Sequence, residues 1–173
     1  IGINTSSNTY ALTAQSLTFD SSPNRVLFTY RSSTQFFAKV LTVTTSSISV
    51  GTQQLVTDER AGEIATTYDS NINRIIFRYN AGSGSSPSTT GVNFRVIGIT
   101  GGSTNTISVT SATFSGNSDA FNNIGTGFVF NPDDNITYVT LKSSTAPLTQ
   151  FPLTSTVSGV TVGTGIVIGS ATN

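Results

Sequence analysis

With histidine absent, carboxylates are the side chains of this sequence that most often serve as catalytic acids or bases. Histidine and cysteine are both absent, so no imidazole can activate a serine and no thiolate can bind zinc or form a disulfide. The acidic residues are Asp20, Asp58, Glu59, Glu63, Asp69, Asp119, Asp133 and Asp134. Two carboxylates in one pocket could hydrolyse a glycosidic bond, so a glycosidase or lyase is the enzyme class to weigh first.

Asp20 and Asp69 have a simpler explanation, because they occupy the same place in a repeated motif. Residues 16–30 read SLTFDSSPNRVLFTY and residues 65–79 read ATTYDSNINRIIFRY. An Asp at the start of a turn can accept a hydrogen bond from the backbone amide two residues on, and Asn tolerates left-handed geometry. We therefore interpret both acids as turn residues and expect no catalytic residue in the chain.

A third, looser copy of the motif spans residues 127–141, which read GFVFNPDDNITYVTL and lack the Arg. A second landmark follows each copy: SISVGT at 47–52, TISVT at 106–110 and GVTVGT at 159–164. Two landmarks that recur in the same order indicate a repeat protein. The structural turn motif then comprises Asp20, Asn24, Arg25, Asp69, Asn73, Arg74, Asn131 and Asn135.

The turn of the third copy also gathers oxygen ligands. Asp133 and Asp134 stand between Asn131 and Asn135, as in a calcium-binding loop, but the alternating acids and the closing Glu of an EF-hand are missing. These two aspartates are the only metal candidates, and we expect no cofactor.

Arginine and aromatic side chains leave two further alternatives. Arg25 and Arg74 could pair with an Asp of a neighbouring repeat or with a ligand carboxylate, although an arginine whose stem packs along the hairpin is the simpler interpretation. The aromatic residues could form a platform for sugars, whereas their alternating, repeat-equivalent placement favours a core. They are Phe19, Phe28, Tyr30, Phe36, Phe37, Tyr68, Phe77, Tyr79, Phe128, Phe130 and Tyr138.

Short runs of β-branched and aromatic residues between turn signals must position these side chains, and they predict four strands in each repeat. The expected strands are 15–19, 25–30, 36–43 and 48–56, then 63–68, 74–79, 93–100 and 107–114, then 125–130, 136–141, 149–156 and 160–168. The fold class is therefore all-β, with three consecutive four-stranded antiparallel repeats. Such repeats are typical of propeller blades, and three blades would be part of a larger propeller or assembly.

The repeats divide the chain into a lead-in at 1–14, repeat 1 at 15–57, repeat 2 at 58–116 and repeat 3 at 117–173. Only 9% of the 173 residues are charged, against about 25% in an average globular protein. Eight basic residues balance eight acidic ones, so nothing attracts phosphate backbones over a distance. We expect no nucleic-acid partner and no insertion into a membrane.

The motif around Asp20, Asn24 and Arg25, together with the landmark at 47–52, resembles repeats of tail-fibre and other virion proteins of tailed, particularly marine, bacteriophages. The resemblance implies propeller-like blades and a non-enzymatic structural component of a phage particle, as tail fibre or decoration. It implies a virion, extracellular location, a homo-oligomer or other virion proteins as partners, and contact with host glycans. The alternative is a bacterial secreted or surface adhesin, or a lectin-like glycan-binding module.

Overall fold

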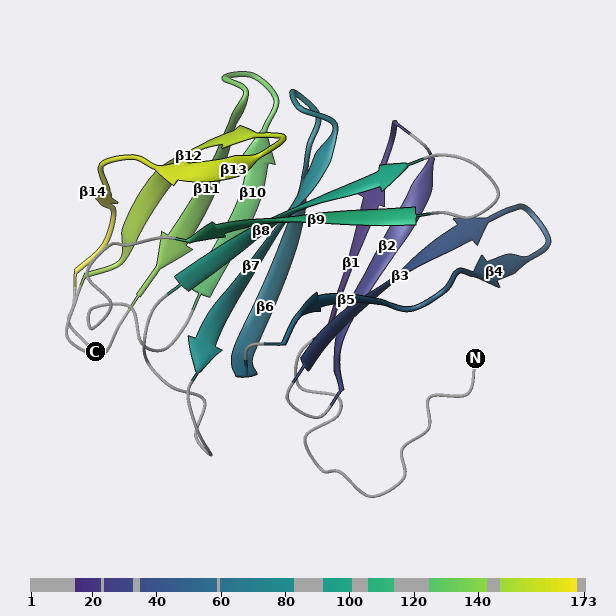
Figure 1. Ribbon diagram of the computed structural model, residues 1–173. Coiled ribbons are helices and arrows are strands. Elements are labelled where there is room, and N and C mark those ends of the chain that lie inside the picture. The colour runs from purple at the N-terminus through teal and green to yellow at the C-terminus, as the bar shows by residue number, and fades with distance from the viewer. Residues whose placement is uncertain are drawn as a thin grey trace.

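The computed structural model describes residues 15–22, 24–32, 35–58, 60–82, 92–100, 106–113, 125–142 and 147–170. These residues form strands and turns (Figure 1). No helix in this part of the chain is long and apolar enough to cross a membrane.

Three antiparallel sheets follow one another along the chain, each made of consecutive strands. The first contains β1 (Gln15–Asp20), β2 (Arg25–Ser32), β3 (Gln35–Val43), β4 (Ile48–Val50) and β5 (Gln54–Thr57). The second contains β6 (Arg60–Asp69), β7 (Arg74–Gly82), β8 (Val92–Thr100) and β9 (Thr106–Thr113). The third contains β10 (Gly125–Asn131), β11 (Ile136–Leu141), β12 (Thr149–Thr156), β13 (Gly159–Val162) and β14 (Ile166–Val167). The predicted all-β fold of three consecutive antiparallel sheets is confirmed.

The outer strand of the first and third sheets is broken, whereas the sequence predicts one continuous strand in each. β4 and β5 both pair with β3, and β13 and β14 both pair with β12. The register puts Gly51, Thr110 and Gly163 at one repeat position, directly after a paired valine. Glycine lacks the side chain that stabilises a strand interior, so β9 continues through Thr110 and the other two outer strands stop.

Each sheet has two faces, because side chains alternate along a strand. We call face 1 of the first sheet the side that carries Val26, Phe28 and Tyr30, and face 2 the side that carries Leu27 and Thr29. The hairpin registers align Ile75, Phe77 and Tyr79 of the second sheet, and Thr137, Val139 and Leu141 of the third, with face 1. The two faces can therefore be compared residue by residue among the sheets.

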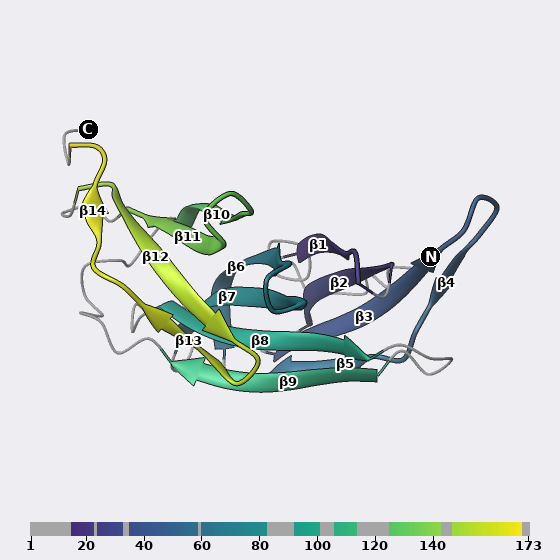
Figure 2. The same ribbon diagram turned by 90° about the horizontal axis from the view of Figure 1, so that it is seen from above.

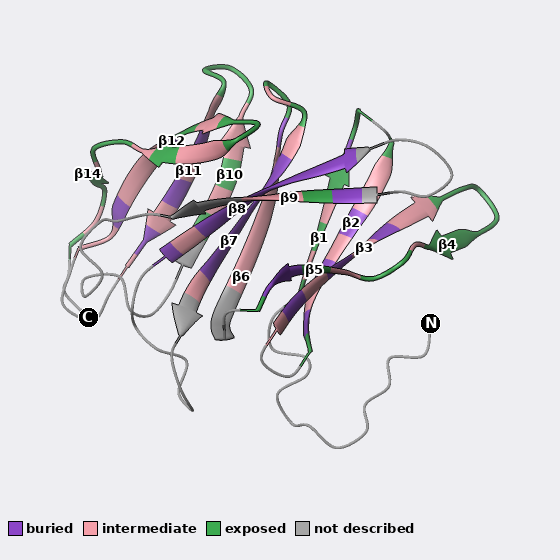
Figure 3. Ribbon diagram, viewed as in Figure 1, coloured by how far each residue is buried: buried purple, intermediate pink, exposed green. Residues whose placement is uncertain are grey.

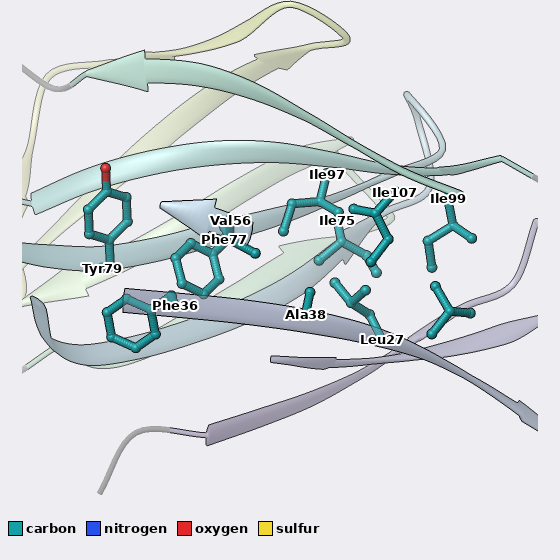
Figure 4. Close-up of a cluster of buried hydrophobic side chains, with 11 residues drawn as sticks. Leu27, Phe36, Ala38, Val56, Ile75, Phe77, Tyr79, Ile97, Ile99 and Ile107 are labelled. Atoms are coloured by element: carbon teal, nitrogen blue, oxygen red, sulfur yellow. The ribbon is translucent and has the colours of Figure 1, made fainter. Parts of the chain in front are cut away.

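The core lies in two junctions, in each of which face 2 of one sheet packs on face 1 of the next. Leu27, Phe36, Ala38 and Val40 of the first sheet cluster with face 1 of the second (Figure 4). The Phe36 and Phe77 rings meet edge to face, with centroids 5.7 Å apart. The second junction joins face 2 of the second sheet to face 1 of the third through Ile76, Val92, Phe94, Val96, Val139, Leu141 and Leu153. Both cores thus depend on the stacking of neighbouring sheets.

The first strands β1, β6 and β10 lie side by side, and the later strands of each sheet extend away from them (Figure 2). Thr66 on β6 forms side-chain hydrogen bonds with Ser16, at 2.5 Å, and with Thr18. On the other side of β6, the Phe130 amide donates to Thr67 Oγ1 at 3.1 Å. The three sheets do not close into a ring, so the propeller stays a prediction.

The prediction that the aromatic residues belong to the core is confirmed for Phe36 of the first sheet but wrong for the other aromatic residues of that sheet, and for Tyr138 on the open face 2 of the third. Phe19 is 53% exposed, and Phe28, Tyr30 and Phe37 are half-buried, whereas Phe77 is completely buried. In Figure 3, β1 is coloured as intermediate and exposed along most of its length. The reason is position in the stack: face 1 of the first sheet has no preceding sheet among the described residues. Repeat-equivalent residues therefore share a register but not an environment.

Candidate functional site

Three Asx turns connect the first two strands of the three sheets. Asp20 Oδ1 accepts from the Ser22 amide at 3.0 Å, and Asp69 Oδ1 accepts from the Asn71 amide at 3.1 Å. In the third turn Asn131 Oδ1 accepts from the Asp133 amide at 3.2 Å. The first residue of each motif is thus committed to holding its own turn.

An asparagine in the left-handed region closes each turn. The φ angles are 55° at Asn24, 51° at Asn73 and 59° at Asn135. Asparagine adopts this region at lower cost than other residues that carry a Cβ. The strand that follows begins one residue later in every copy, which keeps the hairpins in the same register.

The second carboxylate oxygens of Asp20 and Asp69 differ, although both residues are buried. Asp69 Oδ2 accepts from Thr137 Oγ1 of the third sheet at 3.3 Å. Asp20 Oδ2 is buried without a hydrogen-bond partner among the described residues. Burial raises the pKa of the Asp20 carboxyl, and the Ser22 amide, the nearby Tyr68 hydroxyl and the Arg74 charge only partly oppose it. Asp20 therefore has a less favourable site than its repeat equivalent.

The described acids do not gather at one place. Asp20 lies on face 2 of the first sheet and Asp69 on face 2 of the second, so the second sheet separates them. Asp58, Asp133 and Asp134 are exposed. Glu59 and Asp119 lie outside the described residues, as does the side chain of Glu63. The paired carboxylates that a glycosidase needs are therefore not formed by Asp20 and Asp69.

Asp133 and Asp134 are the candidate calcium ligands, and both carboxylate oxygens of Asp134 accept hydrogen bonds within the hairpin. Its Oδ1 accepts from the Ile136 amide at 3.0 Å, and its Oδ2 accepts from the Tyr138 hydroxyl at 2.8 Å. This hydrogen bond, then burial, then the charge of Asp134 raise the pKa of Tyr138. No group of three acidic side chains that could hold a metal occurs in the described ranges. The geometry therefore assigns Asp134 to the hairpin.

Arg25 and Arg74 follow the left-handed asparagines and turn back on their own hairpins. Arg25 Nη1 donates to the Asn24 carbonyl at 3.2 Å, and Arg74 Nη1 donates to the Asn73 carbonyl at 2.8 Å. The Arg74 side chain also lies over Gly98, where an added Cβ would come within 2.9 Å of Nε. These contacts agree with arginine side chains that pack along their own sheet, and the charge of Arg74 also acts on Asp20 of the preceding repeat.

An apolar surface on the first sheet was missed by the sequence reasoning. Six large hydrophobic residues are about half exposed or more, and the register puts all of them on face 1. They are Leu17, Phe19, Val43, Ile48, Val50 and Leu55. An exposed patch of this kind marks an interaction site in many soluble proteins. The repeats themselves gave a signal, because Leu17 stands where the covered second sheet has Thr66.

Face 2 of the third sheet is the other open end of the stack. It carries Val129, which is 56% exposed, together with Tyr138, Pro152 and Ile166. The described chain thus begins with an uncovered face 1 and ends with an uncovered face 2.

These features define an all-β repeat protein whose sheets stack through opposite faces. No family model, no curated protein and no solved structure matches the chain significantly. The likeness to bacteriophage tail-fibre and virion proteins therefore stays a prediction from the sequence.

Proposed function

We propose that this chain is a non-enzymatic structural component of a bacteriophage particle, either in a tail fibre or in a decoration of the virion. The observation that carries the proposal is the threefold use of one sheet as a stacking unit. Sheets that stack through their faces make a rigid body that can be lengthened by adding units. The sequence resemblance supplies the context of a virion.

The contacts that the polar side chains make support a structural role. The Asx residues hold turns, and Thr66, Thr67 and Thr137 connect neighbouring sheets. Arg95 lies buried over the Tyr79 ring, with its guanidinium carbon 5.1 Å from the ring centroid, and donates to Thr57 of the first sheet. Polar groups that are engaged in this way stabilise the stack and are not free to act on a substrate.

Mass spectrometry of purified phage particles from the source of the chain would test the proposal. Peptides of this chain should copurify with infectious particles through a density gradient, in a constant ratio to the capsid protein. Recovery of the chain only from the culture medium or from the bacterial surface would refute it.

An adhesin that binds glycans is the second candidate, and one observation favours it. Phe28 and Tyr30 stack with centroids 5.1 Å apart, and Phe37 lies 6.1 Å from Tyr30, all on the uncovered face 1. Aromatic rings with a polar tip suit such binding, but sugars also need hydrogen-bonding groups around the rings. Lys39 is the only charged residue that the register puts on this face within β1, β2 and β3, and the neutral polar groups there belong to Gln15, Tyr30, Ser32 and Gln35. The structural role is the stronger proposal, because it accounts for the contacts between all three sheets and the adhesin accounts for one face.

A glycan array separates the two candidates. Specific binding that Tyr30→Ala abolishes and Val157→Ala leaves unchanged would favour the adhesin. Absence of binding at micromolar protein would favour the structural component.

A further inference from the structure

The open face 1 of the first sheet has the residues of a covered face. In the second and third sheets, face 1 is covered by face 2 of the preceding sheet, and the same positions are buried. In the first sheet those positions are occupied by Val26, Phe28, Tyr30 and Leu41. A polar side chain at these positions would have been compatible with an end of the stack that faces water. The face is therefore built for a neighbouring sheet.

A cation over a tyrosine ring is repeated on this face. In the second sheet Arg95 lies over Tyr79, and both residues are buried against the first sheet. Lys39 and Tyr30 occupy the equivalent positions, with Lys39 Nζ 5.9 Å from the centroid of the Tyr30 ring. A cation shielded by an aromatic ring can be buried at lower cost than a bare one. The same device thus occurs once inside the stack and once on its open end.

The contacts between first strands at the two junctions indicate which residues a sheet covering face 1 of the first sheet would carry. At the first junction, Thr18 on face 2 forms a hydrogen bond with Thr66 on face 1 of the next sheet. At the second junction, Thr67 on face 2 accepts from the Phe130 amide. In the third sheet, Val129 occupies the position that Thr18 and Thr67 have in the first two sheets. In the first sheet, Leu17 occupies the position of Thr66, and Phe19 occupies the position of Phe130. Only at the two open ends are both partners apolar.

The two open faces complement each other, because Val129 on one and Leu17 and Phe19 on the other are all exposed in the single chain. Leu17 is 64% exposed, Phe19 53% and Val129 56%. If face 2 of a third sheet covered face 1 of a first sheet in the same register, Val129 would lie against Leu17 and Phe19. The contact would remove apolar surface from water on both sides, which favours association.

We propose that a second copy of this chain covers face 1 of the first sheet with face 2 of its third sheet. The contact continues the junctions already present within the chain, and the third sheet carries the only uncovered face 2 in the described residues. The contact is made by two different surfaces, so each copy offers one of each, and such contacts form rings when they close. Two copies give six sheets, within the range of about four to eight blades in closed propellers.

Light scattering and sedimentation equilibrium of the purified chain test the proposal directly. The chain should form a dimer at micromolar concentration. Phe19→Lys and Val129→Lys, each on one of the two surfaces, should raise the dissociation constant by at least about tenfold, which corresponds to about 1.4 kcal/mol. The control is Val157→Lys, because Val157 is 55% exposed in the turn between β12 and β13. It should leave the dimer intact.

Mixing the two interface variants tests the pairing of unlike faces. The Phe19→Lys chain keeps an intact third sheet, and the Val129→Lys chain keeps an intact first sheet. At a concentration where each variant alone is monomeric, a mixture should form a one-to-one complex through the one contact that both substitutions leave intact. Circular dichroism and thermal melting would establish that both variants are folded.

Two results would overturn the proposal. One is a wild-type chain that stays monomeric at about 100 μM. The other is a dimer that survives Val129→Lys and is lost in Phe19→Lys, because this would mean that two first sheets pair with each other. Neither result depends on whether the chain is found in phage particles, so this proposal and the proposed function can fail separately.

Discussion

Asp69 accepts a hydrogen bond from Thr137 across the junction between the second and third sheets, with Oδ2 3.3 Å from Oγ1. At the first junction the position of Thr137 is taken by Ile75, which has no hydroxyl group. The equivalent Asp20 therefore has a buried Oδ2 without a hydrogen-bond partner in the described residues. Thr137 thus satisfies the second carboxylate oxygen of Asp69, and Ile75 at the equivalent position cannot do the same for Asp20.

Asp20→Asn should stabilise the protein at neutral pH. Burial raises the pKa of Asp20, so between the pKa of the unfolded carboxyl, about 4, and the higher folded value the native state binds more protons. The contribution of Asp20 to stability therefore falls as the pH rises through this window and is lowest above it. Asparagine keeps an Oδ1 for the Ser22 amide, as Asn131 does for Asp133.

Thermal melting between pH 3.5 and 8 would test this prediction. The melting temperature of Asp20→Asn should exceed that of the wild type at pH 7, and the difference should shrink toward pH 4. Asn131→Asp, at the half-buried equivalent position, provides the comparison. A lower melting temperature for Asp20→Asn across the whole range would contradict the account of Asp20.

Asn24→Ala should destabilise the first hairpin by about 1 kcal/mol, because a Cβ without a local polar group is costly in left-handed geometry. Asn24→Gly should remain within a few tenths of a kcal/mol of the wild type, since glycine adopts this φ freely. Urea unfolding would measure both differences. Equal destabilisation by alanine and glycine would show that the side chain matters and the φ angle does not.

Phe77→Ala should cost about 3–5 kcal/mol in free energy of unfolding, as expected for a fully buried phenylalanine. Phe28→Ala, at the equivalent position of the first sheet, should cost only about 1–2 kcal/mol when the chain is monomeric, because the ring is half-buried. Denaturant unfolding at low concentration would give both values. Similar losses would mean that face 1 of the first sheet is already covered within one chain.

Asp134→Asn should lower the pKa of Tyr138. The Asp134 carboxylate accepts a hydrogen bond from the Tyr138 hydroxyl and so stabilises the neutral phenol, which is the main reason why the pKa of Tyr138 is raised. Absorbance of the tyrosinate between pH 9 and 12 would follow the change. Asp133→Asn is the matched control, because no hydrogen bond joins Asp133 to Tyr138. A comparable shift in the control would assign the effect to overall charge.

The sequence predicted the sheets because local chemistry determines them. The Asx residue and the left-handed Asn specify each turn within six residues, and alternating apolar residues specify the strands beside it. The break in two outer strands could have been predicted from Gly51 and Gly163 where the second copy has Thr110. The alternation of apolar and polar residues alone does not predict the break, because this pattern takes no account of the side chain that glycine lacks.

The exposed face of the first sheet could not be predicted from residue types. Phe28 and Phe77 have the same pattern around them, and only the number of sheets before each one makes one half-buried and the other buried. Burial between repeats is a property of the stack, so it has to be read by comparing copies. Leu17 against Thr66 and Val129 against Thr67 are the comparisons that carry this information.

The two interrupted outer strands limit how these chains can aggregate. β4, β5, β13 and β14 contain three, four, four and two residues, so an approaching strand finds only short rows of free backbone groups. The one long outer strand, β9, has β13 of the third sheet beside it. Chains crowded together at high local concentration would therefore resist strand pairing along this outer margin, whereas the first strands of the three sheets lie beside one another at the opposite margin.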